Sequence, residues 1–191
     1  MLDNQAPLLR RVALIFDALG HGLCLLLSLA AVAIALSLPR RWFALLTFAV
    51  AEGLSTLISL GLKALVGRDR PPAGLVHPLT TSFPSGHTTY AGATCVALVL
   101  LFSAPGPRRR GWWILAGLGV GGMAWSRTYL QVHWLSDVVA GALLGIGVSL
   151  VVFAGAQILP RRRARPSSGF LRPHAATQFG EPSRQDDSGH H

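Results

Sequence analysis

The sequence predicts an all-α integral membrane protein, a helical bundle with about five transmembrane helices. Of its 191 residues 51% are hydrophobic and only 13% are charged, and the apolar residues form long runs rather than an amphipathic pattern. Both features are typical of proteins that lie in a bilayer. The net charge of +9 is also typical of nucleic-acid-binding proteins. Most arginines, however, lie in short turns between apolar runs or just after the last run, which indicates membrane topology and no nucleic-acid partner.

Five apolar runs define the expected helices. The first, residues 12–38, is long for one crossing, which needs about 20 apolar residues, and polar residues interrupt its first half. We therefore expect an interfacial helix over 11–20 and a crossing over 21–38. Because no small-residue cleavage site follows this run, we expect it to be retained. The other crossings are expected over 42–66, 85–103, 111–126 and 134–159.

Composition divides the chain into an N-terminal segment over 1–20, a membrane domain over 21–159 and a polar tail over 160–191. The tail has few apolar residues, so we expect it to be disordered. With five crossings, the arginines at 40–41, at 108–110 and in the tail fall on one face of the membrane. The positive-inside rule makes that face, and the C-terminus, cytoplasmic.

A first polar cluster ends the second apolar run. Lys63 and Arg70 are seven residues apart, two helical turns, so both side chains can project from one face before Pro71 stops the helix. An ammonium beside a guanidinium suits a phosphoryl group whose oxygens are held from several directions. Taken alone, the pair is equally typical of juxtamembrane residues that contact lipid headgroups.

A second cluster, Pro84-Ser85-Gly86-His87, precedes the third apolar run. Ser85 is expected as a helix N-cap, and Gly86 lets backbone N–H groups approach an anion closely. His87, in the first turn, would lie over that anion and could protonate a departing oxygen. The alternative is an ordinary capped helix start that happens to carry a histidine.

The third cluster lies at the start of the last run. His133 and Asp137 are four residues apart, which places the carboxylate beside the imidazole. The carboxylate can hold Nδ1–H and leave Nε2 as an unprotonated nucleophile, and Arg127 would complete an oxyanion clamp. A surface His–Asp pair is the alternative for this cluster alone. The three clusters together predict a phosphoryl-transfer site on the outer face of the membrane.

All eleven positions of Lys63-x6-Arg70-Pro71, Pro84-Ser85-Gly86-His87 and Ser126-Arg127-x5-His133-x3-Asp137 resemble the signature of the type 2 phosphatidic-acid phosphatase superfamily, which includes the vanadium haloperoxidases. The resemblance implies roles for eight of these positions. Phosphate binding is implied for Lys63, Arg70, Ser85, Gly86 and Arg127, with His87 as general acid, His133 as nucleophile and Asp137 as its orienting partner. It also implies that no metal ion or other cofactor is required.

The same resemblance implies a protein of the bacterial cytoplasmic membrane, and the arginine distribution predicts that its active site faces the periplasm or the exterior. Bacterial membrane members typically resemble six-span proteins with three spans before the first motif, whereas two spans and an interfacial helix precede it here. We expect either a start that is shortened relative to those proteins or a protein that works with five spans.

The expected activity is hydrolysis of a lipid phosphate or diphosphate through a phosphohistidine intermediate. Outward orientation favours undecaprenyl diphosphate, with phosphatidylglycerophosphate and phosphatidate as alternatives. A lipid phosphotransferase would share the covalent step. A vanadate-dependent haloperoxidase and a non-catalytic lipid-phosphate binding protein are weaker alternatives. The residues leave the oligomeric state open.

Three further features receive structural interpretations. Glu52, inside the second span without an evident partner, is expected to be structural or protonated. Asp17 is expected to be an ordinary interfacial residue. The two pairs of glycines spaced by four, 117 with 121 and 141 with 145, are expected to allow close helix contacts within the chain.

Overall fold

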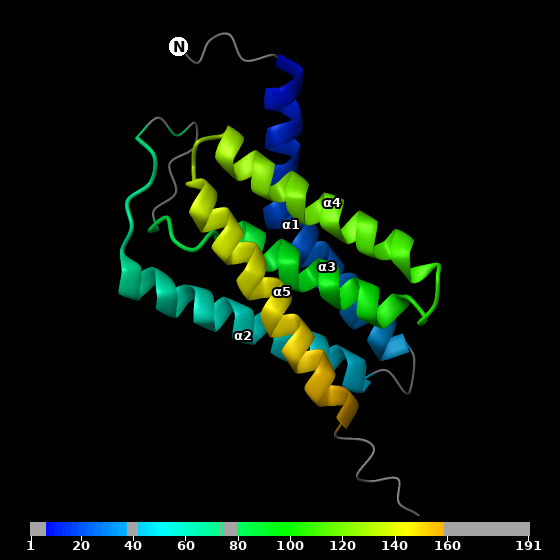
Figure 1. Ribbon diagram of the computed structural model, residues 1–191. Coiled ribbons are helices and arrows are strands. Elements are labelled where there is room, and N and C mark those ends of the chain that lie inside the picture. Colours follow the sequence, from blue (N-terminus) through cyan, green and yellow to red (C-terminus); the bar gives the residue numbers. More distant parts are fainter. Residues whose placement is uncertain (1–6, 38–41, 73, 75–79, 159–191) are drawn as a thin grey trace, which may run out of the picture.

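The computed structural model describes residues 7–37, 42–72, 74 and 80–158, and within these ranges every regular element is a helix. The helices pack together as one bundle, shown in Figure 1. In chain order they are α1 (Pro7–Ser37), α2 (Trp42–Val66), α3 (Gly86–Phe102), α4 (Arg109–Tyr129) and α5 (Leu135–Ile158). The all-helical prediction is confirmed. The predicted tail over 160–191 lies outside the described residues.

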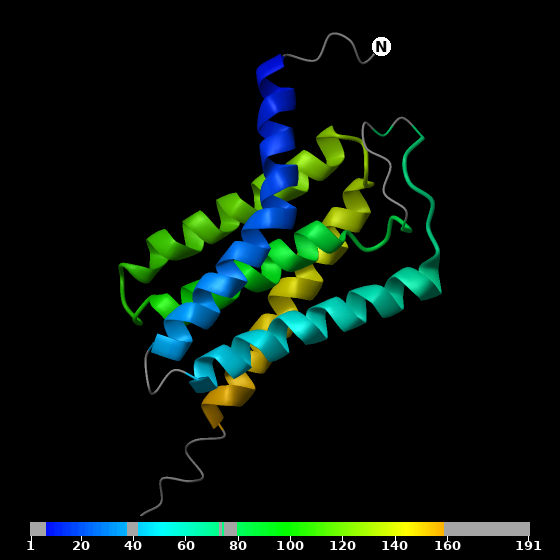
Figure 2. The same cartoon turned by 180° about the vertical axis from the view of Figure 1, so that it is seen from behind.

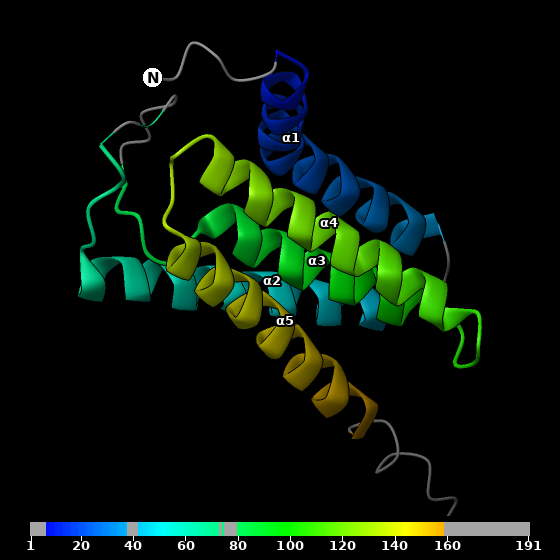
Figure 3. The ribbon, with the colours of Figure 1, turned by 45° about the horizontal axis from the view of Figure 1, so that its top comes forward.

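One continuous helix, α1, stands where the sequence predicted an interfacial helix and a separate crossing. No proline interrupts residues 8–37, and a chain in apolar surroundings keeps its backbone N–H and C=O groups paired by staying helical. The helix bends instead of breaking, as Figure 3 shows. The boundary predicted between residues 20 and 21 is therefore not a helix boundary. The interfacial position of the first turns stays a prediction.

Helix α3 lies at the centre of the bundle and contacts each of the other four helices. Its contact with α5 is close because α5 presents Gly141 and Gly145 to it. A Cβ atom on Gly145 would overlap the carbonyl oxygen of Thr89, and one on Gly141 would lie 2.5 Å from that of Ser85. The expectation of close packing at this pair is confirmed. Through this contact the start of α5, which carries Asp137, is fixed against the start of α3.

The second glycine pair behaves differently. Both Gly117 and Gly121 have open space where a Cβ atom would stand, so the prediction of an intramolecular contact there is wrong. The close approach on α4 is made by Gly122, whose missing side chain makes room for the ring of Phe16 on α1. A four-residue spacing of glycines does not by itself identify which face of a helix is packed.

Large apolar side chains on all five helices face outward, for example Ile15, Leu57, Trp112 and Val151, which are each 44% to 72% exposed. Such an outer surface is expected for a protein in contact with lipid. By length and composition two helices, α2 and α5, are suited to cross a membrane, and α3 is apolar but shorter.

The two ends of the bundle differ in chemistry. One end gathers the C-terminal ends of α2 and α4 with the N-terminal ends of α3 and α5, and carries the three polar clusters; it lies to the left in Figure 1 and to the right in Figure 2. The turn between α3 and α4, with Arg108, Arg109 and Arg110, lies at the other end. The other arginines predicted for this second end, at 40–41 and 161–165, lie outside the described residues.

Candidate active site

His133 lies in the short connection between α4 and α5 and is almost completely buried, with 4% of its surface exposed. The chain reverses just before it at Gln131, which adopts a positive φ of 52°, a conformation uncommon for a residue with a side chain. Arg127, at the end of α4, is connected to His133 by this turn. The backbone N–H of Val132 donates to the Arg127 carbonyl oxygen at 3.2 Å and fixes the turn.

The imidazole of His133 is held neutral by its surroundings. Its Nε2 lies 3.2 Å from Nη1 of Arg70. Because a guanidinium can only donate, this contact requires a lone pair on Nε2 and places the ring proton on Nδ1. Burial, followed by the positive charges of Arg70 and Lys63, lowers the pKa of His133 to about 4; Asp137 and a hydrogen bond with the Ser82 backbone act in the opposite direction. An unprotonated Nε2 is the form of histidine that can act as a nucleophile.

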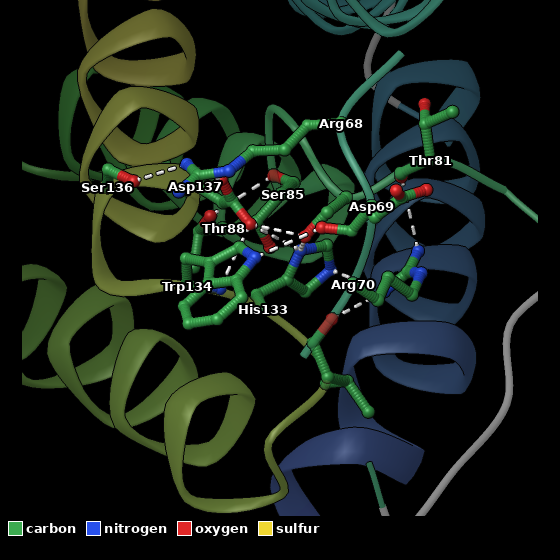
Figure 4. Close-up of polar contacts among 12 residues, drawn as sticks. Arg68, Asp69, Arg70, Thr81, Ser85, Thr88, His133, Trp134, Ser136 and Asp137 are labelled. Carbon is green, nitrogen blue, oxygen red and sulfur yellow. Dashed lines mark hydrogen bonds and ion pairs between the residues drawn. The ribbon is translucent and has the colours of Figure 1, made fainter. Parts of the chain in front are cut away.

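Asp137 is fully buried and is bonded by several donors at once, as Figure 4 shows. Its Oδ2 accepts a hydrogen bond from the hydroxyl of Ser82 and another from the backbone N–H of Trp134 at 2.9 Å. Its Oδ1 accepts from Nη1 of Arg68, also at 2.9 Å. The distance from Oδ2 to Nδ1 of His133 is 3.6 Å. Asp137 is thus adjacent to His133, as predicted, but most of its hydrogen bonds go to other groups.

The two cations of the first cluster converge on the segment that precedes α3. The Lys63 ammonium donates to the carbonyl oxygen of Thr81 at 2.8 Å. Arg70 donates from Nε to the carbonyl oxygen of Thr80 at 2.8 Å and from Nη1 to that of Val132 at 2.7 Å. These carbonyl groups are neutral acceptors, so a phosphate oxygen that carries charge would compete well for the same donors.

The start of α3 lies directly against the start of α5. Ser85 takes the N-cap position, as predicted, and its backbone N–H donates to the carbonyl oxygen of Asp137 at 3.0 Å. Its side chain makes no capping hydrogen bond, and its buried Oγ has no partner among the described residues. Thr88 and Thr89 donate instead to the Ser85 carbonyl oxygen. Gly86 begins the helix with open space where a Cβ atom would stand, which leaves its backbone accessible to an anion.

Arg127 and His87 form a second group, together with Asp17 of α1. Nη1 of Arg127 donates to Oδ1 of Asp17 at 2.6 Å, and Nε2 of His87 lies 3.8 Å from the same oxygen. This second group interacts electrostatically with the first group, the residues around His133. Burial lowers the pKa of Arg70 and the charge of Arg127 lowers it further, whereas Asp137 acts in the opposite direction.

The structure therefore gathers all eight predicted site residues at one end of the bundle, in two adjoining groups. Sequence reasoning missed three contributors: Arg68, Ser82 and Asp17. Arg68 lies within the first predicted motif and Ser82 stands two residues before the second, and these positions were the available signal for them. Asp17 was interpreted as an ordinary interfacial residue, and the contact with Arg127 corrects that interpretation. Glu52 also has a partner that the sequence did not reveal, since Thr94 donates to its Oε1 at 2.7 Å.

An open pocket of about 550 Å³ reaches the site from the surface. His133 is one of the residues that line it. The lining residues are Pro71, Pro72, Thr128, Gln131, His133, Trp134 and Leu135. Within the described part of the chain, no three His, Cys, Asp or Glu side chains gather as they would around a metal ion.

Comparison with known protein families identifies the family of this chain. The model of the PAP2 superfamily matches residues 42–159, from the start of α2 to the end of α5. This chain belongs to the PAP2 superfamily. The resemblance inferred from the three motifs is confirmed, and the matched segment contains all three of them.

The names of the curated relatives of this chain describe phosphatases of phosphorylated lipids. The chain is 35% identical over 112 residues to phosphatidylglycerophosphatase B of Bacillus subtilis, covering 56% of this chain and 55% of that protein. It is 37% identical over 123 residues to decaprenylphosphoryl-5-phosphoribose phosphatase of Mycobacterium tuberculosis, covering 62% and 64% respectively. The match thus spans between half and two thirds of these relatives.

A solved PAP2 structure has the same arrangement of helices. The transmembrane PAP2 type phosphatidylglycerolphosphate phosphatase from Bacillus subtilis superimposes with a TM-score of 0.73 at 28% identity, covering 82% of this chain and 80% of that one. LpxE of Aquifex aeolicus superimposes with a TM-score of 0.63 at 26% identity, covering 80% and 89%.

Proposed function

We propose that this PAP2 protein is a membrane lipid phosphatase that hydrolyses a lipid phosphate or diphosphate through a phosphohistidine intermediate. The observation that carries the proposal is the state of His133. A buried, neutral imidazole presents the lone pair of Nε2 toward Arg70, a group that binds phosphate oxygens readily. Arg70 would transfer its hydrogen bond from Nε2 to the arriving phosphoryl group and so expose the nucleophile.

In the first step, Nε2 of His133 attacks phosphorus and the bond from phosphorus to the lipid oxygen breaks. His87 donates its proton to the departing oxygen, and Lys63, Arg70 and Arg127 stabilise the charge on the other phosphoryl oxygens. Asp137, held by its other donors, stabilises the positive charge that develops on the His133 ring.

In the second step, water attacks the phosphohistidine. His87, now unprotonated, accepts a proton from that water, the phosphorus–nitrogen bond breaks, and inorganic phosphate leaves with His133 neutral again. Each step uses only protein side chains and water, in line with the metal independence that the motif resemblance implies.

A lipid substrate is supported by the apolar outer surface and by the open pocket beside His133. The relatives named above act on phosphatidylglycerophosphate and decaprenyl lipids, and a further relative from Sulfolobus acidocaldarius, 37% identical over 82 residues, is an undecaprenyl-diphosphatase. Among the candidates we favour undecaprenyl diphosphate, with phosphatidylglycerophosphate and phosphatidate as alternatives.

The proposed orientation places the site on the periplasmic or exterior face of the bacterial cytoplasmic membrane. Arg108, Arg109 and Arg110 lie at the opposite end of the bundle, which the positive-inside rule assigns to the cytoplasm. A fluorescent protein fused after residue 191 should then fluoresce in cells. A dark fusion of normal abundance would contradict this orientation.

The decisive experiment measures phosphate release from undecaprenyl diphosphate, phosphatidylglycerophosphate and phosphatidate by the detergent-purified protein in EDTA. Wild type is compared with His133→Ala, and acid-quenched samples are tested for phosphohistidine. Release that depends on His133 supports the mechanism and ranks the lipids. Equal release by both proteins would contradict it. Transfer of the phosphoryl group to an added lipid alcohol, in place of phosphate release, would instead identify a phosphotransferase.

A further inference from the structure

Asp17 of α1 makes one oxygen atom the meeting point of two groups from the predicted site. Its Oδ1 is 2.6 Å from Nη1 of Arg127 and 3.8 Å from Nε2 of His87. The guanidinium of Arg127 is buried, with 4% of its side chain exposed, whereas Asp17 and His87 are each exposed by about a fifth. A buried guanidinium needs a paired anion, and Asp17 supplies it when no phosphate is bound.

The position of Asp17 is fixed by close packing of α1 against the site. The hydroxyl of Ser126 donates to the carbonyl oxygen of Ala13 at 2.8 Å, one turn before Asp17. The ring of Phe16 occupies the space left by Gly122 on α4. One turn after Phe16, the missing side chain of Gly20 makes room for the ring of His87. Three contacts within two turns therefore hold this part of α1 against the end of α4 and the start of α3, which carry site residues.

We propose that Asp17 is a positioning residue of the active site: its carboxylate holds the Arg127 guanidinium and the His87 imidazole so that both face one bound phosphoryl group. The inference rests on the proposed function. It extends the site to α1, a helix that lies outside the residues matched by the PAP2 family model. The negative charge also favours the protonated form of His87, which the first chemical step consumes.

The charged groups around Asp17 come from several elements. Arg127 of α4 and His87 of α3 face it directly. On α1 itself, Arg10 and Arg11 lie about two turns earlier and are exposed. Arg70, from the segment after α2, interacts electrostatically with Arg127, whose positive charge lowers the pKa of Arg70. Removing the Asp17 charge takes a negative charge away from His87 and leaves the positive charge of Arg127 uncompensated beside it. Both changes disfavour the protonated imidazole of His87, so both move the alkaline limb of the pH dependence to lower pH.

The test compares Asp17→Asn, which keeps the size and removes the charge, with Asp17→Glu, which keeps the charge. Asp69→Asn is the matched control, because it makes the same chemical change at an exposed carboxylate at the same end of the bundle. The readouts are kcat and KM from pH 5 to pH 10 and the midpoint of thermal unfolding in detergent. For Asp17→Asn we expect kcat to fall at least about 10-fold. Its alkaline limb should move down by about one pH unit, whereas Asp17→Glu and Asp69→Asn should keep the wild-type limb.

Wild-type kcat and an unmoved alkaline limb in folded Asp17→Asn would overturn the inference. So would a fall in kcat that only follows a lowered unfolding midpoint, because Asp17 would then merely dock α1. If Asp17→Asn does not fold, Asp17→Glu decides: activity with the wild-type limb supports the inference, and a folded but inactive protein overturns it. Failure of the proposed function is distinct, because it shows as activity in His133→Ala.

Discussion

The carboxylate of Asp137 approaches the imidazole of His133 to 3.6 Å, Oδ2 to Nδ1, and the hydroxyl of Ser82 lies within reach of both groups. Ser82 donates to Asp137 Oδ2, and its Oγ is 3.4 Å from Nδ1 of His133. The two residues predicted to act as a direct pair are therefore joined by a third, fully buried side chain. Arg68 holds the other carboxylate oxygen, so the orientation of His133 depends on a residue within the first motif and on one just before the second.

Replacement of Ser82 by alanine should lower kcat about 10-fold, because one hydrogen bond of about 1.4 kcal/mol that orients Asp137 and His133 is lost. The control is Ser103→Ala, the same substitution at the opposite end of α3, where the hydroxyl donates to the carbonyl oxygen of Val99. Steady-state kinetics on the best lipid substrate give the comparison. Equal kcat values for the two variants would show that Ser82 does not orient the pair.

Activity should persist in acid to an unusual degree. The pKa of His133 is lowered to about 4, so the imidazole is unprotonated above that pH and loses its nucleophilic form only as the pH falls through it. The acid limb of kcat/KM should lie near pH 4 instead of near 6.5, after correction for ionisation of the substrate phosphate. The alkaline limb should report loss of the proton from His87. An acid limb near 6.5 would show that His133 is not held neutral in the free enzyme.

Arg70→Gln should reduce kcat/KM about 100-fold or more, since a glutamine cannot provide the charged fork that stabilises the phosphoryl oxygens. Inhibition by orthovanadate, which has the charge and size of phosphate, should weaken in parallel. Arg110→Gln removes the same charge from an exposed position in the first turn of α4, at the opposite end of the bundle, and should leave both measurements unchanged. Parallel losses in the two variants would point to general surface electrostatics as the cause.

A leucine at residue 145 should destabilise the bundle by at least about 2 kcal/mol, because its side chain cannot fit against the backbone of α3 at Thr89. Gly147→Leu is the matched control, two residues further along α5 and facing open space. Thermal unfolding of both variants in detergent measures the difference. Similar unfolding midpoints would mean that α3 and α5 separate in solution. The same contact fixes Asp137 against Ser85, so Gly145→Leu should also lower kcat.

Much of the helical framework was predictable from local features. The apolar run over 42–66 predicted both ends of α2 to the residue, and Ser85 with Gly86 marked the start of α3. These features act over a few residues, through the helical period and the capping of backbone groups, so they are visible in the order of the residues. The exception is α1, where polar residues suggested a break that backbone pairing prevents.

By itself, the sequence determined the helical membrane class, the family and which residues are candidates for the phosphate site, because spaced motifs and apolar runs are properties of the chain. Tertiary structure alone decided which neighbours these residues have. The pairing of Asp17 with Arg127 joins positions 110 residues apart, and that of Arg68 with Asp137 joins positions 69 apart. Such contacts depend on how closely α1, α3, α4 and α5 pack at their glycines and small residues. This packing depends on the shapes of surfaces that are distant in the sequence, so a local sequence pattern cannot predict it.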